Sequence, residues 1–347
     1  MDERIEGLLG EVARLGGSDL LFAPGRPAAA RVDGELVPIG DGGSLTPGAT
    51  EQLARALAGS RWDELVAQRE LDFSFSFGEV ARVRANLFYQ RGTLAGALRF
   101  VPYEIPTLEE LGAPAVCLDI VRSPHGLVLV TGPTGSGKST TLAAMIDRIN
   151  RDRAAHIVTI EDPIEYVHRH RRGMVVQREV GSDTLEFARA LRSALRENPD
   201  VVLVGEMRDL ETVAGTLTMA ETGHLVFATL HTNDTAQAVD RIVDVFPAAQ
   251  QSQIRTQLSQ TLLAIIHQRL LPRADGSGRT AAFEVMVATP AVRNLIKEGK
   301  TNQLRNVVVT GSAAGMQTLE ADLRRLVSAG IVAPAVAAGA TRRVEEL

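Results

Sequence analysis

Apolar and polar positions along the chain indicate a first part built from short elements. Apolar residues recur at helical spacing from Ile5 to Leu15, and Gly16-Gly17 predicts the end of this helix. Farther along, Thr46 is typical of the N-cap of a second helix. Short strands are predicted at residues 19–22, 29–32 and 35–39, the last two joined by the hairpin signal Asp33-Gly34.

The rest of this part follows a period of two. Residues 71–77, LDFSFSF, alternate apolar and polar positions as a half-buried strand does. Two longer stretches flank Arg91-Gly92 and predict a hairpin. Residues 1–102 are therefore predicted to form a small α+β domain.

The pattern changes after residue 102. Pro106 and Pro114 predict an extended linker over residues 103–122, with one short helix from Leu108 to Leu111. From residue 123 to 347 we predict an α/β domain, because apolar strands alternate with helices as in a parallel sheet covered on both faces. The chain after about residue 250 is expected to be mainly helical. The predicted strands are 127–131, 156–160, 201–204 and 225–230.

A phosphate-binding loop follows the first of these strands. Residues 132–139 fit the pattern G-x-x-x-x-G-K-[ST] in full, between an apolar strand and an amphipathic helix. Glycines let backbone N–H groups turn toward a phosphate, and the start of the following helix favours an anion. Lys138 can reach the β- and γ-phosphates, and the Ser139 hydroxyl can bind Mg²⁺. The candidate ATP-binding residues are Gly132, Pro133, Thr134, Gly135, Ser136, Gly137, Lys138, Ser139 and Thr140.

Carboxylates stand where two of the other predicted strands end. Glu161, Asp162 and Glu165 follow one strand, and Glu206 follows another. Parallel strands of one sheet end on the same side as the phosphate loop, so these acids should face the nucleotide. Glu206 is a candidate for binding Mg²⁺ and water, and Glu165 is a candidate general base. For Glu161 and Asp162, loop solvation or helix capping is the competing interpretation.

Histidines flank the strand predicted at 225–230. His231 stands at its carboxyl end, where it could sense the γ-phosphate, whereas His224 precedes the strand and should lie away from that edge. His168 and His170 lie among basic residues, and a surface position is favoured over a metal site for this pair. Lone histidines are usually structural, so this spacing alone assigns them no role.

Composition limits the classes of function. The formal net charge is −5, which argues against a general nucleic-acid binder. Cys117 is the one cysteine, so neither a disulfide within the chain nor a thiolate zinc site is possible. The charged N-terminal stretch lacks the apolar core of a signal peptide, and residues 327–340 are too short and interrupted to span a bilayer. We expect a cytoplasmic protein that meets a membrane only through partners.

Several longer strings resemble the secretion ATPase superfamily of type II secretion and type IV pili. Besides the phosphate loop they are TIEDPIEYVH (159–168), residues 177–212, AETGHLVFATLHTND (220–234) and DRIVDVFP (240–247). The resemblance implies a RecA-like ATPase domain after a PAS-like α+β domain, and hydrolysis of ATP with Mg²⁺. It further implies a homo-hexamer that acts on a pilus platform protein and is peripheral at the inner membrane through that machinery.

The resemblance also assigns roles to individual residues. Glu165 stands in the position of the catalytic glutamate, and Glu206 is the Walker B acid. His224 and His231 form the His box. Guanidinium groups at the γ-phosphate would stabilise charge in the transition state. Four arginines match residues that reach the nucleotide, in two pairs: Arg84 with Arg99, and Arg192 with Arg196, the second pair expected one helical turn apart on one face.

Within the superfamily the chain resembles the branch that powers pilus retraction and twitching motility. AVRNLIKEG (291–299) is similar to that branch's retraction motif, with Val292 and Lys297 as departures, although an ordinary amphipathic helix is the competing interpretation. GMQTLEADLRRLVSAG (315–330) resembles the branch's C-terminal helices. Leu21 and Ala228 depart from the usual residues of the superfamily.

Three other functions stay open. A pilus-assembly or type II secretion ATPase would carry the same ATP site. A regulatory subunit would bind nucleotide and hydrolyse it poorly, but the intact Glu165 and Glu206 argue against it. A motor that translocates nucleic acid is disfavoured by the acidic balance.

Overall fold

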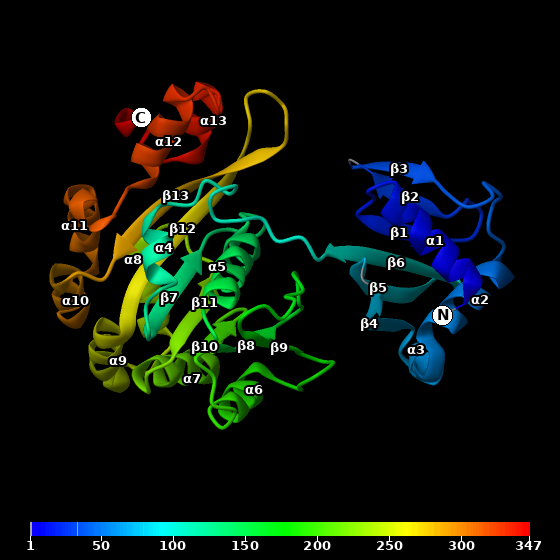
Figure 1. Ribbon diagram of the computed structural model, residues 1–347, viewed down its shortest axis with the longest axis horizontal. Helices are drawn as coiled ribbons and strands as arrows, with labels where there is room; N and C mark the ends of the chain where they lie inside the picture. The colour runs from blue at the N-terminus through cyan, green and yellow to red at the C-terminus, as the bar shows by residue number, and fades with distance from the viewer. Residues whose placement is uncertain (1, 33, 79) are drawn as a thin grey trace. The chain divides into compact units, whose positions relative to one another are not determined.

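The computed structural model describes residues 2–32, 34–78 and 80–347 and divides the chain into two compact units (Figure 1). The first comprises residues 1–104 with 165–167, and the second comprises residues 105–164 with 168–347. The first is an antiparallel α+β unit and the second has a largely parallel sheet, so the predicted fold class is confirmed. Asp33, half of the predicted hairpin signal, lies outside the described residues.

An antiparallel sheet, six-stranded over the described residues, forms the centre of the first unit. The strands lie in the order β3-β2-β1-β6-β5-β4, and the hairpin predicted around Arg91-Gly92 is present as β5 and β6. The strands are β1 (Asp19–Phe22), β2 (Ala29–Val32), β3 (Glu35–Pro38), β4 (Glu70–Phe77), β5 (Ala81–Gln90) and β6 (Thr93–Pro102).

Helices cover one face of this sheet. Leu20 and Leu98, which face each other across β1 and β6, pack in one apolar core with Leu9 of the first helix. The second helix begins as predicted, because the Thr46 hydroxyl accepts a hydrogen bond from the backbone N–H of Ala49. The helices are α1 (Glu3–Arg14), α2 (Pro47–Ala58), the 3₁₀ turn η1 (Gly59–Arg61) and α3 (Trp62–Gln68).

The second unit contains a sheet that has seven strands over the described residues, in the order β13-β12-β7-β11-β10-β8-β9. Neighbouring strands are parallel except for the β12–β13 pair. The four strands predicted from the sequence are present as β7, β8, β10 and β11. The strands are β7 (Gly126–Thr131), β8 (His156–Glu161), β9 (Met174–Glu179), β10 (Val201–Val204), β11 (Leu225–Leu230), β12 (Leu262–Pro272) and β13 (Arg279–Val287).

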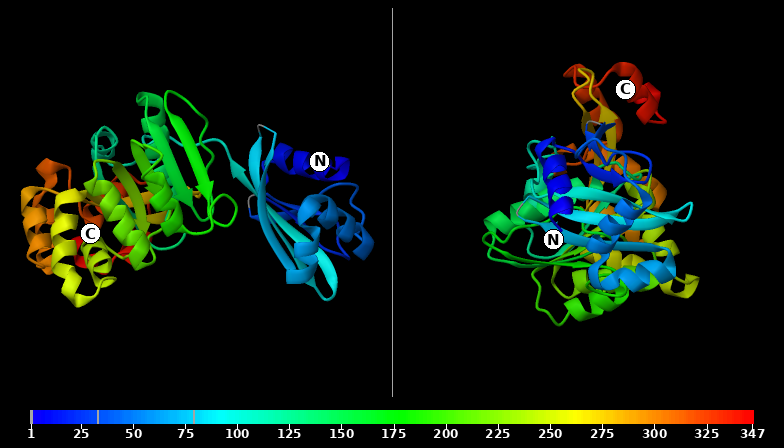
Figure 2. Two further views of the ribbon diagram at one scale, coloured as in Figure 1. Left: turned by 90° about the horizontal axis from the view of Figure 1, so that it is seen from below. Right: turned by 90° about the vertical axis from the view of Figure 1, so that its right-hand side faces the viewer.

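Helices cover both faces of the second sheet (Figures 1 and 2). Alternate residues of β7 face opposite sides of the sheet. Leu129 packs in the apolar core that one face forms with α7, α8, α9 and α10, whereas Val128 and Val130 pack against α5 on the other face. A strand buried on both sides needs an unbroken apolar run, which explains why β7, β10 and β11 were recognisable. The helices are α4 (Val116–Ile120), α5 (Lys138–Asp152), α6 (Phe187–Ala194), α7 (Leu210–Glu221), α8 (Thr235–Asp244), α9 (Ala248–Thr261), α10 (Pro290–Lys297), α11 (Leu304–Thr310), α12 (Leu319–Ser328) and α13 (Pro334–Ala340), with 3₁₀ turns η2 (Thr301–Gln303), η3 (Ser312–Ala314) and η4 (Val344–Glu346).

Two elements differ from the predictions. The chain after residue 250 is more helical than extended, as predicted, but the prediction missed β12 and β13, which form a long antiparallel pair with β12 beside β7. An apolar run such as β12 fits a buried strand and a buried helix alike, so only its pairing partner decides. Residues 108–111 form a turn instead of a helix. Thr107 and Glu110 exchange the hydrogen bonds of a helix start, but the positive φ of Gly112 ends the segment after one turn.

The segment that enters the second unit is partly buried there. Leu108, Cys117 and Ile120 pack in the core with α5. Burial raises the pKa of the Cys117 thiol to about 12, so this thiol is an apolar core group at neutral pH.

Among the described residues, none of the helices combines the length and the apolar character needed to span a bilayer.

Candidate nucleotide-binding and hydrolysis site

The phosphate loop joins the end of β7 to the start of α5. Lys138 is 8% exposed, and its ammonium donates hydrogen bonds to the carbonyl oxygens of Gly132 (2.9 Å) and Pro133 (3.1 Å). The ammonium therefore lies over the inner side of the loop, where it can exchange these carbonyls for phosphate oxygens. The Ser136 hydroxyl is buried and lacks a hydrogen-bond partner among the described residues, which suits a loop that wraps an anion.

Gln268 of β12 holds this loop from behind, and the sequence did not indicate it. Its buried amide donates to the carbonyl of Ser136 (2.6 Å) and accepts from the hydroxyl of Thr141 on α5 (2.8 Å). Gly137 has φ +89°, and a Cβ there would come within 2.8 Å of the Gln268 amide nitrogen. The loop glycine therefore serves both the left-handed backbone and the close approach of β12.

Replacing Gln268 with Leu should weaken both the fold and ATP binding. The change leaves the Ser136 carbonyl and the Thr141 hydroxyl buried without partners, at about 1–3 kcal/mol for each group. We expect urea unfolding to show a free energy of unfolding lower by about 2–6 kcal/mol for the two groups together, and the KM for ATP to rise. Gln253→Leu on the exposed side of α9 is the matched control. An unchanged KM would show that Gln268 has no part in shaping the loop.

The acidic side of the site lies where β10 and β11 end. Glu206 pairs with Arg208 (2.6 Å) through one carboxylate oxygen and lies 3.2 Å from His231 Nε2 through the other. Burial acts to raise the pKa of Glu206, but the hydrogen bond and charge of Arg208 and the charge of Lys138 outweigh it, and the pKa lies below its ordinary value. Burial and the charge of Lys138 lower the pKa of His231, which favours the neutral imidazole beside Glu206. The structure thus brings Lys138, Glu206 and His231 together at one edge of the sheet, as predicted.

The acids after β8 occupy different surroundings. Glu161 accepts hydrogen bonds from Thr159 (2.6 Å) and from Gln177 of β9 (3.2 Å). Asp162 is exposed and precedes a cis proline. The pKa of Arg208 is raised mainly by the hydrogen bond and charge of Glu206, and the charge of Asp162 adds to this effect. Glu165 is exposed and belongs to the segment that groups with the first unit, so its role as general base stays a prediction.

Arg84 and Arg99 belong to the first unit and share the face of its sheet that the helices leave uncovered. They lie opposite each other across β5 and β6, and Arg99 lies opposite Asp19 across β6 and β1. Arg99 Nε is 2.9 Å from Asp19 Oδ1, and Asp19 is 8% exposed. Asp19 therefore fixes the direction of Arg99 within its own unit, and the reach of both arginines toward nucleotide stays a prediction.

The second arginine pair does not share a helix. Arg192 lies on α6 and pairs with Glu211 of α7 at 3.3 Å, with both side chains largely exposed. Arg196 lies beyond α6, which ends at Ala194 and continues as a turn. The expectation of two arginines one turn apart on a helix was therefore wrong, because Pro199 and the positive φ of Asn198 follow too closely for the helix to continue.

Other histidines lie away from the site or are buried. His224 precedes β11, and its Nδ1 lies 3.0 Å from the carbonyl of Met219 at the edge opposite the phosphate loop, as predicted. His170 is exposed, but His168 is 7% exposed, so the predicted surface position was wrong for His168. Burial lowers the pKa of His168 to about 4. Burial, with the charges of Arg269 and Lys138, lowers that of His267 on β12 to about 4.

These two buried histidines should make the fold sensitive to acid. Their folded pKa near 4 lies below the ordinary 6.5, so the unfolded chain binds more protons between pH 6.5 and 4, and stability falls as pH falls through this range. At pH 5 each should cost about 2 kcal/mol of unfolding free energy relative to pH 7. Urea unfolding at both pH values measures this. His168→Gln or His267→Gln should reduce the difference, whereas His125→Gln, at an exposed position, should not.

The residues present fit a nucleotide with Mg²⁺. No group of three or more His, Cys, Asp or Glu side chains in the described parts of the chain could hold a metal. Mg²⁺ in nucleotide sites is commonly bound by few protein oxygens together with phosphate oxygens. Ser139 at the start of α5 and Glu206 are the protein groups that match this pattern.

Comparisons with known proteins show which family the chain resembles. Residues 107–338 match the family described as type II/IV secretion system protein. A twitching motility protein of Neisseria gonorrhoeae is 56% identical over 268 residues, covering 77% of this chain and 72% of that protein. The type IV pilus retraction ATPase PilT of Pseudomonas aeruginosa is 48% identical over 335 residues, covering 94% and 95%. A crystal structure of the pilus retraction motor PilT with bound ADP matches with a TM-score of 0.91 and 48% identity, covering 99% of this chain and 98% of that one.

The chain belongs to the type II/IV secretion system protein family and is a nucleotide-binding P-loop ATPase. Within the family it is PilT-like over nearly its full length.

Proposed function

We propose that this protein is a homo-hexameric motor that couples ATP hydrolysis to retraction of type IV pili and so to twitching motility. The observation that carries the proposal is the Glu206 carboxylate, which is held between Arg208 and His231 within the field of Lys138. An ionised carboxylate at this edge could hold Mg²⁺ and organise the attacking water, as hydrolysis requires. The relatives named for retraction and twitching support the mechanical output.

Hydrolysis would depend on positioning and charge. The N–H groups of the phosphate loop and Lys138 would bind the β- and γ-phosphates, and Ser139 and Glu206 would hold Mg²⁺, which neutralises phosphate charge when bound. Glu165 would take a proton from the attacking water. His231, whose Nε2 lies 3.2 Å from Glu206, would respond to loss of the γ-phosphate, because the charge near Glu206 then changes.

The arginines would complete the site on the phosphate side. Arg84 and Arg99 lie on one face of the first unit, and Asp19 aims Arg99. We propose that this face and the pair Arg192 and Arg196 reach γ-phosphates within the hexamer. The linker at 103–122 would then serve as the hinge on which nucleotide state changes the position of the two units.

Mechanical output would pass through the surface of α10 to a platform protein at the inner membrane. Val292 and Ile296 are buried, and Arg293 donates to the carbonyls of Ser259 and Gln260 at the end of α9. Packing of an ordinary amphipathic helix therefore explains the residues on the buried side of α10, but it does not explain those on the exposed side. Asn294 and Lys297 are exposed and available to a partner.

Pilus imaging in a strain that lacks the protein tests the output. We expect abundant pili that extend and do not retract, together with loss of twitching. A copy carrying Lys300→Ala, at an exposed ion pair with Glu298, should restore retraction. Absence of pili in the deletion strain would instead indicate an assembly ATPase.

A further inference from the structure

A buried carboxylate on β13 holds the start of α8. Glu284 is 8% exposed, and its Oε1 accepts hydrogen bonds from the backbone N–H (2.8 Å) and from the hydroxyl (2.6 Å) of Thr235. Thr235 is the first residue of α8 and is itself 2% exposed. The first N–H groups of a helix have no partner within the helix, so Glu284 satisfies one of them from a distant strand.

The same helix start carries His231, because residues 231–235 join the end of β11 to α8. Within this segment the Thr232 hydroxyl donates to the carbonyl of Asp234 (3.1 Å), and the Asp234 carboxylate caps α8 at the N–H of Gln237 (2.8 Å). These local bonds shape the turn. The bonds to Glu284 attach it to another part of the sheet, so they help to set where His231 lies.

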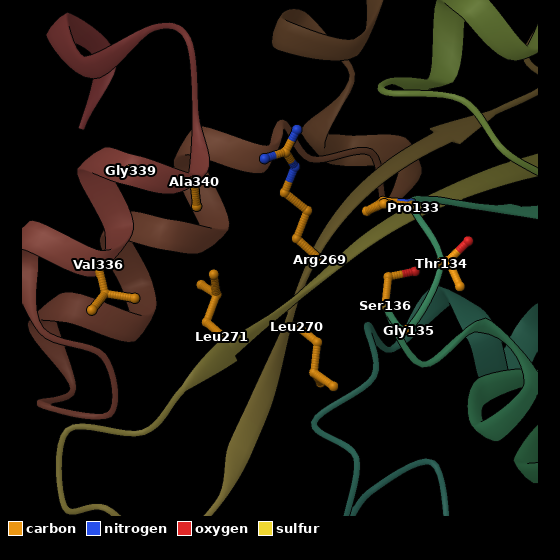
Figure 3. Close-up of a pocket in the computed structure, with 10 residues that line it drawn as sticks. All are labelled: Pro133, Thr134, Gly135, Ser136, Arg269, Leu270, Leu271, Val336, Gly339 and Ala340. Carbon is orange, nitrogen blue, oxygen red and sulfur yellow. The ribbon is translucent and has the colours of Figure 1, made fainter.

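The register of the sheet places Glu284 in one row with the edge that forms the ATP site. Glu284 pairs with His267 of β12, and His267 pairs with Thr131 of β7. Thr131 pairs in turn with Leu230 of β11, the residue before His231. Thr131 is followed by the phosphate loop, and residues of β12 and of this loop line one pocket (Figure 3). Glu284 therefore acts from the same rigid edge that carries the loop.

The surroundings of Glu284 favour a role as hydrogen-bond acceptor over a role as a charge. Burial raises the pKa of Glu284, the charges of Asp234 and Glu320 add to this effect, and the bonds from Thr235 oppose it. The carboxyl can accept from Thr235 through Oε1 whether it is ionised or protonated. A glutamine at this position would keep an acceptor oxygen and would carry no buried charge.

We propose that Glu284 is a positioning residue for ATP hydrolysis: by fixing the start of α8 it holds His231 at its distance of 3.2 Å from Glu206. The inference rests on the proposed hydrolysis of ATP and on the proposed part of His231 in it. Glu284 acts through the segment 231–235, so its loss should change the rate of hydrolysis and leave the affinity for ATP. A misplacement of about 1 Å at a reacting centre can cost about 10²-fold in rate.

A double-mutant cycle between Glu284 and His231 tests this proposal. Single-turnover hydrolysis gives the rate, including rates too slow for a steady-state assay, and equilibrium binding gives the Kd for ATP. Glu284→Leu should lower the rate about tenfold or more and change the Kd less than about twofold. Glu284→Gln, which keeps the acceptor oxygen, should leave both within about twofold. In the slower His231→Ala protein, adding Glu284→Leu should change the rate less than about twofold, because the side chain that Glu284 positions is gone.

Two further variants separate positioning from general damage to the fold. Asp322→Leu removes a buried carboxylate that accepts the backbone N–H of Phe283 (2.8 Å), the residue next to Glu284. It should lower the free energy of unfolding and leave the rate within about twofold. Thr235→Val keeps the shape of the side chain and removes only the hydroxyl bond to Glu284. It should lower the rate about fivefold, and less than about twofold alongside His231→Ala, so it serves even if Glu284→Leu does not fold.

Three results would overturn the proposal. The first is an equal loss of rate from Glu284→Leu or Thr235→Val with and without His231. The second is a Glu284→Gln rate as low as that of Glu284→Leu. The third is a His231→Ala protein that hydrolyses ATP at the unmodified rate, which would leave the ATPase function intact. If the unmodified protein hydrolysed no ATP, the proposed function itself would fail, and this inference with it.

Discussion

Glu206→Gln should lower the kcat for ATP hydrolysis by about 10²-fold or more while leaving nucleotide affinity within a few-fold. The amide keeps the size of the side chain and can still bond to His231, but it loses the negative charge that Arg208 and Lys138 stabilise. Removing one positioned group that stabilises charge in the transition state costs about 10²–10³-fold in kcat. Steady-state ATPase assays with a parallel measurement of ATP binding separate the two quantities.

The matched control for this change is Glu221→Gln. Glu221 lies at the end of α7 and accepts a hydrogen bond from Gln257 at an exposed position, away from the phosphate loop. Its rate should equal that of the unmodified protein. Equal and negligible rates for the unmodified protein and Glu206→Gln would favour the regulatory subunit over the motor.

Lys138→Ala should remove most of the affinity for ATP. The ammonium is nearly buried and bonded to two loop carbonyls, so it is already positioned for the phosphates and little ordering is needed on binding. Truncating one partner of a buried, hydrogen-bonded charge pair costs about 2–5 kcal/mol, or roughly 30- to 4,000-fold in Kd. Equilibrium binding of a fluorescent ATP analogue measures it.

Lys297→Ala provides the comparison, because this lysine is exposed on α10 and lies outside the ATP site. Its ATP affinity should match that of the unmodified protein, which separates loss of the loop ammonium from a general change in charge. A Kd for Lys138→Ala within threefold of the unmodified value would contradict the assignment of the phosphate loop as the ATP site.

The sequence by itself determined what depends on contiguous residues. The phosphate loop needs a strand, glycines, a lysine and a helix start within a few residues of one another, so its pattern is visible along the chain. Strands buried on both faces can also be predicted, because each is an unbroken apolar run in the sequence. Since these strands are parallel, Glu206 and His231, which follow two of them, lie at one edge of the sheet.

Only the tertiary structure decided what depends on pairing between distant segments. Gln268 bonds to groups that lie 132 and 127 residues away, and nothing in the local pattern of β12 distinguishes it from a residue of a buried helix. Local sequence favours a conformation for many segments. Where an apolar run suits strand and helix alike, as in β12, the conformation is set by the distant segment that packs against it, and so is the partner of a buried polar group.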